Sequence, residues 1–267
     1  MTHILSLAAG TLPEFAPPAV AEAAGIAGFS HVGFTIEPDQ WNTAMLRSTK
    51  QALRDHNLSV LDVEVIWIPE GGAVDDSHKL IIEAGAELSA PNVLVVSAEP
   101  DQDCTAAALH QLCEWAAPAG MQVSLEFLMI TAVQSLDTAI SIVEKADHEA
   151  AGVLIDTLHF CRAGHQPADL TAKDPGLFAY TQICDGNAEC APGFETWLED
   201  AIDLRSVPGE GELPVHNIMT ALPDNIPLSL EIRSRRWRDA FPDAADRAKA
   251  IHAKTQQFFA AENISFR

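Results

Sequence analysis

The segment Gln122-Val-Ser-Leu-Glu126 is a short apolar run closed by an acidic residue, and its pattern returns three times further along the chain. The later copies also end in an acid or an amide: Gly152-Val-Leu-Ile-Asp156, Phe178-Ala-Tyr-Thr-Gln182 and Pro227-Leu-Ser-Leu-Glu231. Burying a carboxylate at the end of a core strand costs several kcal/mol unless a partner compensates its charge. One such residue alone is most simply the first polar residue of a loop. Four polar residues at the same position of their strands favour one shared partner that compensates their charge, and a divalent cation would meet this requirement.

Short β-like segments end at regular intervals along the chain. We place these ends near Ala8, Thr35, Trp67, Ser97, Glu126, Asp156, Gln182 and Glu231, with helical patterns at residues 42–56, 76–88, 105–117, 136–146 and 244–261. Most neighbouring ends lie about thirty residues apart, the length of a strand with its returning helix. Eight such units in 267 residues predict an α/β fold of the (β/α)8 TIM barrel type.

A doubly wound open sheet is the alternative fold. The segment Ala8-Ala-Gly10-Thr-Leu-Pro13 after the first strand lacks the glycine pattern of a dinucleotide-binding sheet. Side-chain alternation also favours the barrel, because Glu126 shares its strand face with Ser124 whereas Val123 and Leu125 occupy the other face. A sheet covered by helices on both sides would be apolar on both faces. We therefore expect the polar face to point into the barrel.

Composition predicts one domain over residues 1–267, since the chain is 48% hydrophobic and has no low-complexity linker. An uninterrupted apolar run of about eighteen residues is missing, which argues against a membrane-spanning helix. The sequence shows no signal peptide, and five cysteines without paired spacing fit a reducing compartment, so we expect a cytoplasmic protein. A net charge of −22 argues against nucleic acid as a partner.

Arginines gather directly after the last predicted strand, at Arg233, Arg235, Arg236 and Arg238. TIM barrels often bind phosphate at this position, and a guanidinium can hold an anionic substrate group through two hydrogen bonds. The alternative is a solvated turn whose arginines pair with the acidic surface. Of the four, Arg233 is the residue we expect to face inward.

Two further segments carry candidate substrate contacts. His159 follows Asp156 by three residues, which would bring its imidazole to the rim of a metal site. Arg205 opens the segment Arg205-Ser-Val-Pro-Gly209-Glu-Gly211, where the glycines would allow the backbone to approach a ligand and Arg205 would hold a substrate oxygen. A rigid turn before the next helix is the alternative for this loop.

Taken in order, Glu126, Asp156-x-x-His159, the Arg205 loop and Leu230-Glu231 resemble the xylose isomerase-like TIM barrels of the sugar isomerase/epimerase superfamily. The resemblance covers essentially the whole chain. It implies one divalent metal ion, Mn²⁺, Mg²⁺, Co²⁺ or Zn²⁺, held by Glu126, Asp156, Gln182 and Glu231. It further implies acid–base roles for Glu126 and Glu231, substrate contacts for His159 and Arg205, and a homo-oligomer as one common state.

The sequence departs from the family pattern at Gln182, where most members have histidine. An amide oxygen still binds a hard cation, so this change favours Mn²⁺ or Mg²⁺. Glutamine at this position is similar to the bacterial 3-dehydroshikimate dehydratases of the same superfamily. Endonuclease IV relatives carry more zinc-binding histidines and a basic face, and the chain lacks both.

The resemblance implies chemistry that begins with removal of a proton beside a carbonyl. A metal polarises the carbonyl of a sugar-like or keto-acid substrate, and a glutamate takes the neighbouring proton to give an enediolate. Return of the proton gives epimerisation or aldose–ketose isomerisation, whereas loss of a β-hydroxyl gives dehydration. We expect an isomerase/epimerase of carbohydrate metabolism first, a dehydratase second and a non-catalytic barrel last, because the four ligands are retained.

Overall fold

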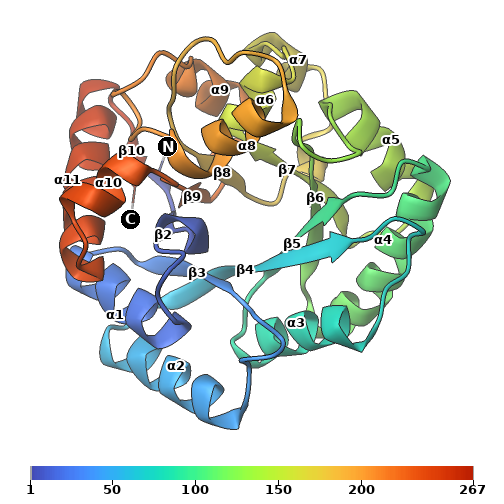
Figure 1. Cartoon of the computed structure of the whole chain (residues 1–267), viewed down its shortest axis with the longest axis horizontal. Coiled ribbons are helices and arrows are strands. Elements are labelled where there is room, and N and C mark those ends of the chain that lie inside the picture. Colours follow the sequence, from blue (N-terminus) through green and yellow to red (C-terminus); the bar gives the residue numbers. More distant parts are fainter. Residues whose placement is uncertain (1, 267) are drawn as a thin grey trace.

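Eight parallel strands close into a barrel in the computed structural model, which describes residues 2–266 (Figure 1). The closed barrel confirms the predicted (β/α)8 fold and excludes the open sheet. Closure occurs where β2 pairs with β9, with Ser6 opposite Ser229. The barrel strands are β2 (Leu5–Leu7), β3 (His31–Thr35), β4 (Ser59–Ile68), β5 (Asn92–Ser97), β6 (Gln122–Glu126), β7 (Ala151–Asp156), β8 (Thr181–Ile183) and β9 (Leu228–Leu230). Each predicted strand end lies within one residue of the observed end.

Helices surround the barrel and connect its strands. They are α1 (Pro17–Ala27), α2 (Thr43–Asp55), α3 (Asp76–Glu87), α4 (Gln102–Ala116), α5 (Leu136–Ala146), α6 (Thr157–Arg162), α7 (Pro167–Thr171), α8 (Phe194–Asp203), α9 (Val215–Ala221), α10 (Arg235–Ala240) and α11 (Ala244–Ala261). Three short 3-10 helices cover Ala9–Thr11, Ala117–Ala119 and Pro175–Leu177. The five helices predicted from the sequence correspond to α2, α3, α4, α5 and α11.

Local capping explains where several helices begin. The side chain of Asn42 accepts hydrogen bonds from the backbone N–H groups of Ala44 and Met45 at 2.9 and 3.1 Å, directly before α2. Ser135 accepts one from Thr138 at 3.2 Å before α5. These side chains satisfy N–H groups that have no partner inside the helix.

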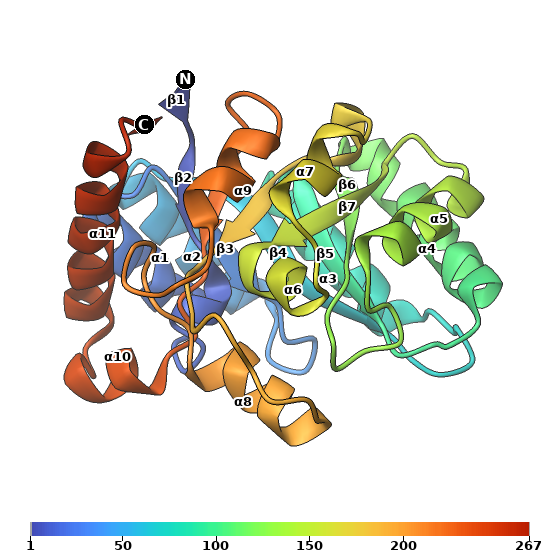
Figure 2. The same ribbon diagram turned by 90° about the horizontal axis from the view of Figure 1, so that it is seen from above.

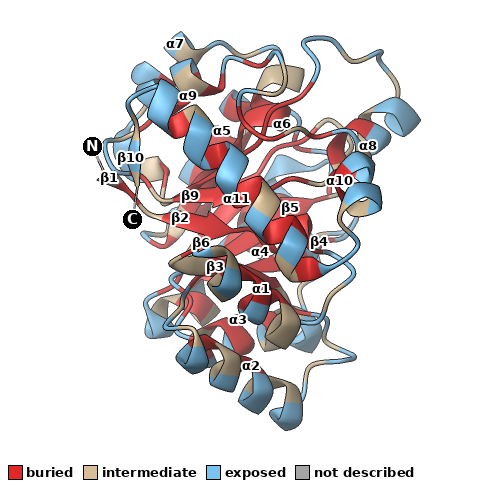
Figure 3. Cartoon of the chain, turned by 90° about the vertical axis from the view of Figure 1, so that its left-hand side faces the viewer, coloured by how far each residue is buried: buried red, intermediate tan, exposed pale blue. Residues whose placement is uncertain are grey.

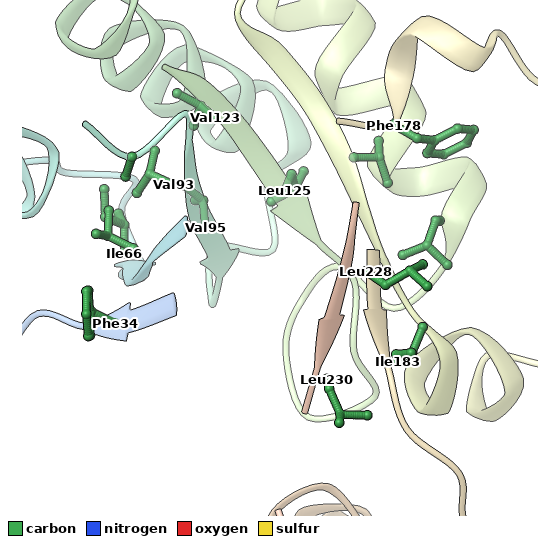
Figure 4. Packing of buried hydrophobic residues seen from close by; sticks show 14 of the residues in the cluster. Phe34, Ile66, Val93, Val95, Val123, Leu125, Phe178, Ile183, Leu228 and Leu230 are labelled. Carbon is green, nitrogen blue, oxygen red and sulfur yellow. The ribbon is translucent and has the colours of Figure 1, made fainter. Parts of the chain in front are cut away.

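The main core lies between the outer faces of the strands and the inner faces of the helices (Figure 3). Figure 4 shows Val93 and Val95 of β5 near Val123 and Leu125 of β6 in this core. A second, smaller apolar cluster includes Leu94, Val96, Leu128, Leu154 and Tyr180. The first two alternate along β5 with Val93 and Val95, so β5 sends apolar side chains to both of its faces.

The two ends of the described chain meet in a short parallel sheet of β1 (Thr2–His3) and β10 (Ser265–Phe266). This sheet lies at the end of the barrel opposite α8 (Figure 2). Among residues 2–266, no helix has the length and apolar character needed to cross a bilayer.

Candidate active site

A pocket of about 570 Å³ opens at the carboxyl ends of the barrel strands. Its lining includes the predicted residues Glu126, His159, Gln182, Arg205, Glu231 and Arg233. These side chains come from different strands and loops, because parallel strands place all their carboxyl ends at one face of the barrel. Asp156 is buried and reaches this group through Arg205.

Arg205 lies at the centre of the polar part of the pocket. It is only 3% exposed, and its Nη1 lies 2.6 Å from Asp156 Oδ2 and 2.7 Å from Glu231 Oε2. Its Nε donates to the carbonyl of Ala201 at 2.7 Å. One guanidinium therefore compensates two buried carboxylates, which would otherwise be strongly destabilising.

Asp156 also starts helix α6. Its Oδ1 accepts hydrogen bonds from the backbone N–H groups of Leu158 and His159 at 2.8 and 3.0 Å. Burial alone would raise the pKa of Asp156, but the positive charge of Arg205, together with the hydrogen bond from the backbone N–H of His159, holds that pKa below its ordinary value. Asp156 is therefore ionised at neutral pH.

His159 is neutral in this environment, because burial lowers its pKa to about 4. Its Nε2 lies 3.2 Å from Nη2 of Arg205. A guanidinium can only donate, so Nε2 accepts and the ring proton belongs on Nδ1. His159 thus helps to orient Arg205.

Glu126 has no arginine contact among residues 2–266, in contrast to Asp156 and Glu231. Its side chain forms no hydrogen bond with any other part of the described chain. Burial raises the pKa of Glu126 well above its ordinary value, and the charges of Asp156 and Glu231 raise it further. Burial likewise raises the pKa of Glu231, although Arg205 opposes that shift. Of these two glutamates, Glu126 is unpaired and Glu231 is paired with Arg205.

A further buried acid, Glu64 of β4, was not predicted from the sequence. Its Oε2 accepts a hydrogen bond from Gln182 Nε2 at 3.3 Å, and its Oε1 accepts one from Thr35 Oγ1 at 3.5 Å. Burial and the charges of Glu231 and Asp62 raise the pKa of Glu64 to about 8. The alternation of acids and apolar residues in Asp62-Val-Glu64-Val-Ile66 was the available signal for a polar inner face.

A polar layer occupies the barrel interior on alternate strands. Ser6 of β2, Asp62 of β4, Ser124 of β6 and Tyr180 just before β8 each carry buried oxygen atoms without a hydrogen-bond partner in residues 2–266. Most TIM barrels fill such layers with branched aliphatic side chains. Burial raises the pKa of Asp62 to about 7, with a further contribution from Glu231. The polar strand face inferred from Ser124 and Glu126 thus recurs on alternate strands of the barrel.

The arginine cluster divides between the pocket and the surface. Arg233 lines the pocket, in agreement with its expected inward orientation. Arg235 and Arg238 form ion pairs with Asp203, and Arg236 pairs with Glu210. These three arginines therefore pair with acidic residues of the surface, as the alternative interpretation of the cluster predicted.

The loop after Arg205 is held by an aspartate. The carboxylate of Asp185 accepts hydrogen bonds from the backbone N–H groups of Gly209 and Leu213, both at 2.9 Å. A Cβ atom on Gly211 would lie 2.4 Å from Asp185 Oδ1. At Gly211 the absence of a side chain therefore lets the backbone approach Asp185, and an approach of this loop to a ligand stays a prediction.

Glu126, Gln182 and Glu231 line the pocket, and the fourth predicted metal ligand, Asp156, lies behind Arg205. Within residues 2–266, no three His, Cys, Asp or Glu side chains are arranged to hold a metal ion. Their chemistry still suits a hard divalent cation, because Asp156 and Glu231 share one guanidinium nitrogen while Glu126 has no cationic contact. The donor set thus fits a metal, and the metal site remains a prediction.

Gly10 gives a test of how tightly this arrangement is packed. A Cβ atom at Gly10 would lie 2.2 Å from Glu231 Oε1, so Gly10→Ala must displace the Glu231 side chain. We expect the midpoint of thermal unfolding to fall, because the displaced carboxylate is buried and paired with Arg205 at 2.7 Å, and turnover to fall about tenfold or more. Thermal unfolding and steady-state kinetics measure the two effects. Unchanged turnover would show that the position of Glu231 is not critical.

A (β/α)8 barrel with buried glutamates around a pocket at its strand ends has the architecture of TIM-barrel enzymes, whose active sites lie at this face. The family model described as xylose isomerase-like TIM barrel matches residues 18–259. The chain belongs to this family, as the sequence resemblance predicted. No curated protein matches the chain.

Several solved structures share the fold at low sequence identity. A xylose isomerase-like TIM barrel/4-hydroxyphenylpyruvate dioxygenase fusion protein has a TM-score of 0.78 and 20% identity, over 100% of this chain and 45% of that protein. The IOLI protein with a bound zinc atom has a TM-score of 0.76 and 17% identity, covering 97% of each chain. D-allulose 3-epimerase from Methylomonas sp. in complex with D-allulose has a TM-score of 0.71 and 14% identity, over 98% of this chain and 97% of the epimerase. The present chain spans less than half of the fusion protein.

Proposed function

We propose that the protein is a metal-dependent isomerase or epimerase that acts on a sugar-like hydroxy ketone through an enediolate. The observation that carries this proposal is the pair of buried glutamates in one pocket, with Glu126 unpaired and Glu231 held by Arg205. Two acid–base groups around one substrate carbon are what proton removal and return require. The zinc atom of the IOLI protein and the D-allulose of the epimerase support a metal and a sugar-like ligand.

Different residues remove the proton, return it and stabilise the negative oxygen of the intermediate. Glu126, which has no competing partner, removes the proton beside the carbonyl. Glu231, kept in place by Arg205 at 2.7 Å, returns a proton from its own side of the substrate. His159 holds Arg205, and Arg205 and Arg233 offer donors to the negative oxygen that develops during enolisation.

A divalent ion would be held by Glu126, Asp156, Gln182 and Glu231. When bound, it would polarise the substrate carbonyl and acidify the neighbouring C–H group. These oxygen donors favour Mn²⁺ or Mg²⁺, with Co²⁺ and Zn²⁺ as further candidates.

The test combines metal content with isotope exchange. Elemental analysis of the purified protein should find about one divalent ion per chain, and chelation should abolish turnover. With Mn²⁺ restored in D₂O, a converted ketose should carry deuterium at the carbon beside its carbonyl, as NMR would detect. Full turnover in the chelated protein, or conversion without solvent deuterium, would refute the proposal.

A dehydratase is the second candidate, and the contact between Gln182 and Glu64 favours it. Loss of a hydroxyl requires an acid that protonates the leaving group. Glu64, whose pKa is raised to about 8 by burial, is a buried carboxylic acid in the same pocket. With 3-dehydroshikimate as substrate, dehydration would give an ultraviolet-absorbing catechol acid. Its formation, with every ketose left unchanged, would place the dehydratase first.

The proposal also includes the location of the protein in the cell and the molecules that it binds. Five free cysteines and a net charge of −22 support a cytoplasmic enzyme that acts on small molecules and binds no nucleic acid. A homo-oligomer remains a proposal from the family resemblance.

A further inference from the structure

A second hollow lies beside the pocket, at the loops that follow β2 and β3. Its volume is about 320 Å³, and Pro13, Thr35 and Glu37 line both the hollow and the pocket. The hydroxyl of Thr35 also donates to Glu64 of the pocket at 3.5 Å. The hollow is therefore continuous with the site of the proposed chemistry, and a substrate that is longer than the pocket would extend into it.

The hollow combines aromatic side chains with polar groups. Phe15 and Trp41 line it, and both are half-buried residues that pack against the core, so each ring is held in place while part of it remains accessible. Glu37 and Gln40 are exposed, and within residues 2–266 neither side chain forms a hydrogen bond or an ion pair. Their polar atoms are therefore available to a ligand.

A pyranose ring matches this combination of side chains. Its C–H groups form an apolar face that packs on an aromatic ring, whereas its hydroxyls need hydrogen-bond partners when they leave water. A carboxylate supplies acceptors, and an amide supplies both donors and an acceptor. A volume of about 320 Å³ is also within the range of small-molecule sites. The hollow thus has the size and the chemistry to hold one sugar ring.

The charges around the hollow disfavour an anionic group. Glu37 has no cationic partner among residues 2–266, and Glu14 is bound to Arg247 at 2.6 Å. Arg247 is only 1% exposed and also donates to the carbonyl of Phe241 at 2.9 Å, so its guanidinium is not offered to a ligand. A phosphate or carboxylate in the hollow would lie against uncompensated negative charge, which weakens binding. The group that fits here is therefore neutral.

We propose that the substrate is a keto sugar that carries a second, neutral sugar ring, with the keto sugar in the pocket and the second ring in the hollow against Trp41. This inference rests on the proposed enolisation chemistry and adds the substrate class. The proton is removed and returned on the keto sugar alone, so the glycosidic bond and the second ring are unchanged. Glu37, which lines both spaces, accepts hydrogen bonds from hydroxyls near the link between the two rings.

Three ketoses that differ only at oxygen 6 test this inference: D-fructose, isomaltulose, which carries a glucosyl ring there, and D-fructose 6-phosphate. With Mn²⁺-loaded protein, isothermal titration calorimetry should give isomaltulose a Kd about tenfold or more below those of the other two. Trp41→Ala and Glu37→Gln should each raise the isomaltulose Kd about three- to tenfold, as expected for a lost ring contact and a weakened hydrogen bond.

The matched control is Trp115→Ala. Trp115 is also a half-buried tryptophan that packs against the core, but it belongs to α4 and lines neither the hollow nor the pocket, so the three Kd values should not change. Circular dichroism checks the fold of each variant. Should Trp41→Ala fail to fold, Glu37→Gln still tests the hollow, because the Glu37 side chain is exposed and makes no contact that the amide would break.

Binding and deuterium exchange together separate this inference from the proposed function. Binding of D-fructose or D-fructose 6-phosphate as tight as that of isomaltulose, or isomaltulose binding that is insensitive to both substitutions, would overturn the substrate class. Tight, Trp41-dependent binding without solvent deuterium at the carbon beside the carbonyl would uphold the substrate class and refute the enolisation chemistry. Equal exchange rates and equal Kd values for D-fructose and isomaltulose would do the reverse.

Discussion

Glu126→Gln should lower kcat by at least about a hundredfold while leaving the fold intact, because it removes a general base and keeps the size of the side chain. Glu126 makes no hydrogen bond with the rest of the described chain, so the amide breaks no contact there. Glu231→Gln should cause a similar loss of kcat, but it also weakens the contact with Arg205 at 2.7 Å. Steady-state kinetics with a converted ketose would measure both effects.

The two variants are informative only if their metal content and fold are normal. Elemental analysis and circular dichroism provide these checks, and Glu22→Gln on the exposed face of α1 is the matched control. If one glutamate removes the proton and the other returns it, exchange with solvent deuterium should persist in the variant that lacks the returning group. Normal kcat in both metal-loaded variants would exclude the two-glutamate mechanism.

Much of the barrel could be predicted because each strand end carried a local signal. An apolar run followed by Glu126 or Asp156 marks both the strand and its carboxyl end, and the thirty-residue spacing supplies the returning helix. The long helices α2, α3 and α5 show an apolar periodicity and begin at capping side chains. Helices α6, α7, α9 and α10 have only five to seven residues, too few for a 3.6-residue period to be recognised.

The contacts inside the site depended on tertiary structure and could not be predicted. Arg205 was expected to hold a substrate oxygen, yet its guanidinium contacts Asp156 and Glu231, which lie 49 and 26 residues away in the sequence. Glu64 and Asp62 lie in a strand that was predicted, but their inward direction depends on the register of β4 in the barrel. A run of alternating residues defines two faces, and only the closed barrel determines which face is inside.

Arg205→Ala should be strongly destabilising at neutral pH. Removing one partner of a buried ion pair typically costs about 3–5 kcal/mol, because the other charge remains buried and unpaired. Here two carboxylates, those of Asp156 and Glu231, would lose the same guanidinium. Urea unfolding would measure the loss. Arg235→Ala is the control, since this exposed arginine pairs with Asp203 at the surface and should change stability little.

The pH dependence distinguishes lost charge compensation from lost packing. In the natural protein the pKa of Asp156 lies below its ordinary value, so ionised Asp156 stabilises the fold above that ordinary value, and this contribution is lost as the pH falls through the folded-state pKa. Without Arg205, burial dominates and raises the folded-state pKa of Asp156 above its ordinary value. The deficit of Arg205→Ala should therefore be largest at neutral pH and shrink as the pH falls and Asp156 and Glu231 become protonated. Mn²⁺ should also restore part of the stability, because it would supply the missing positive charge. A deficit that is equal at pH 5 and pH 8 and unaffected by Mn²⁺ would mean that Arg205 acts through packing alone.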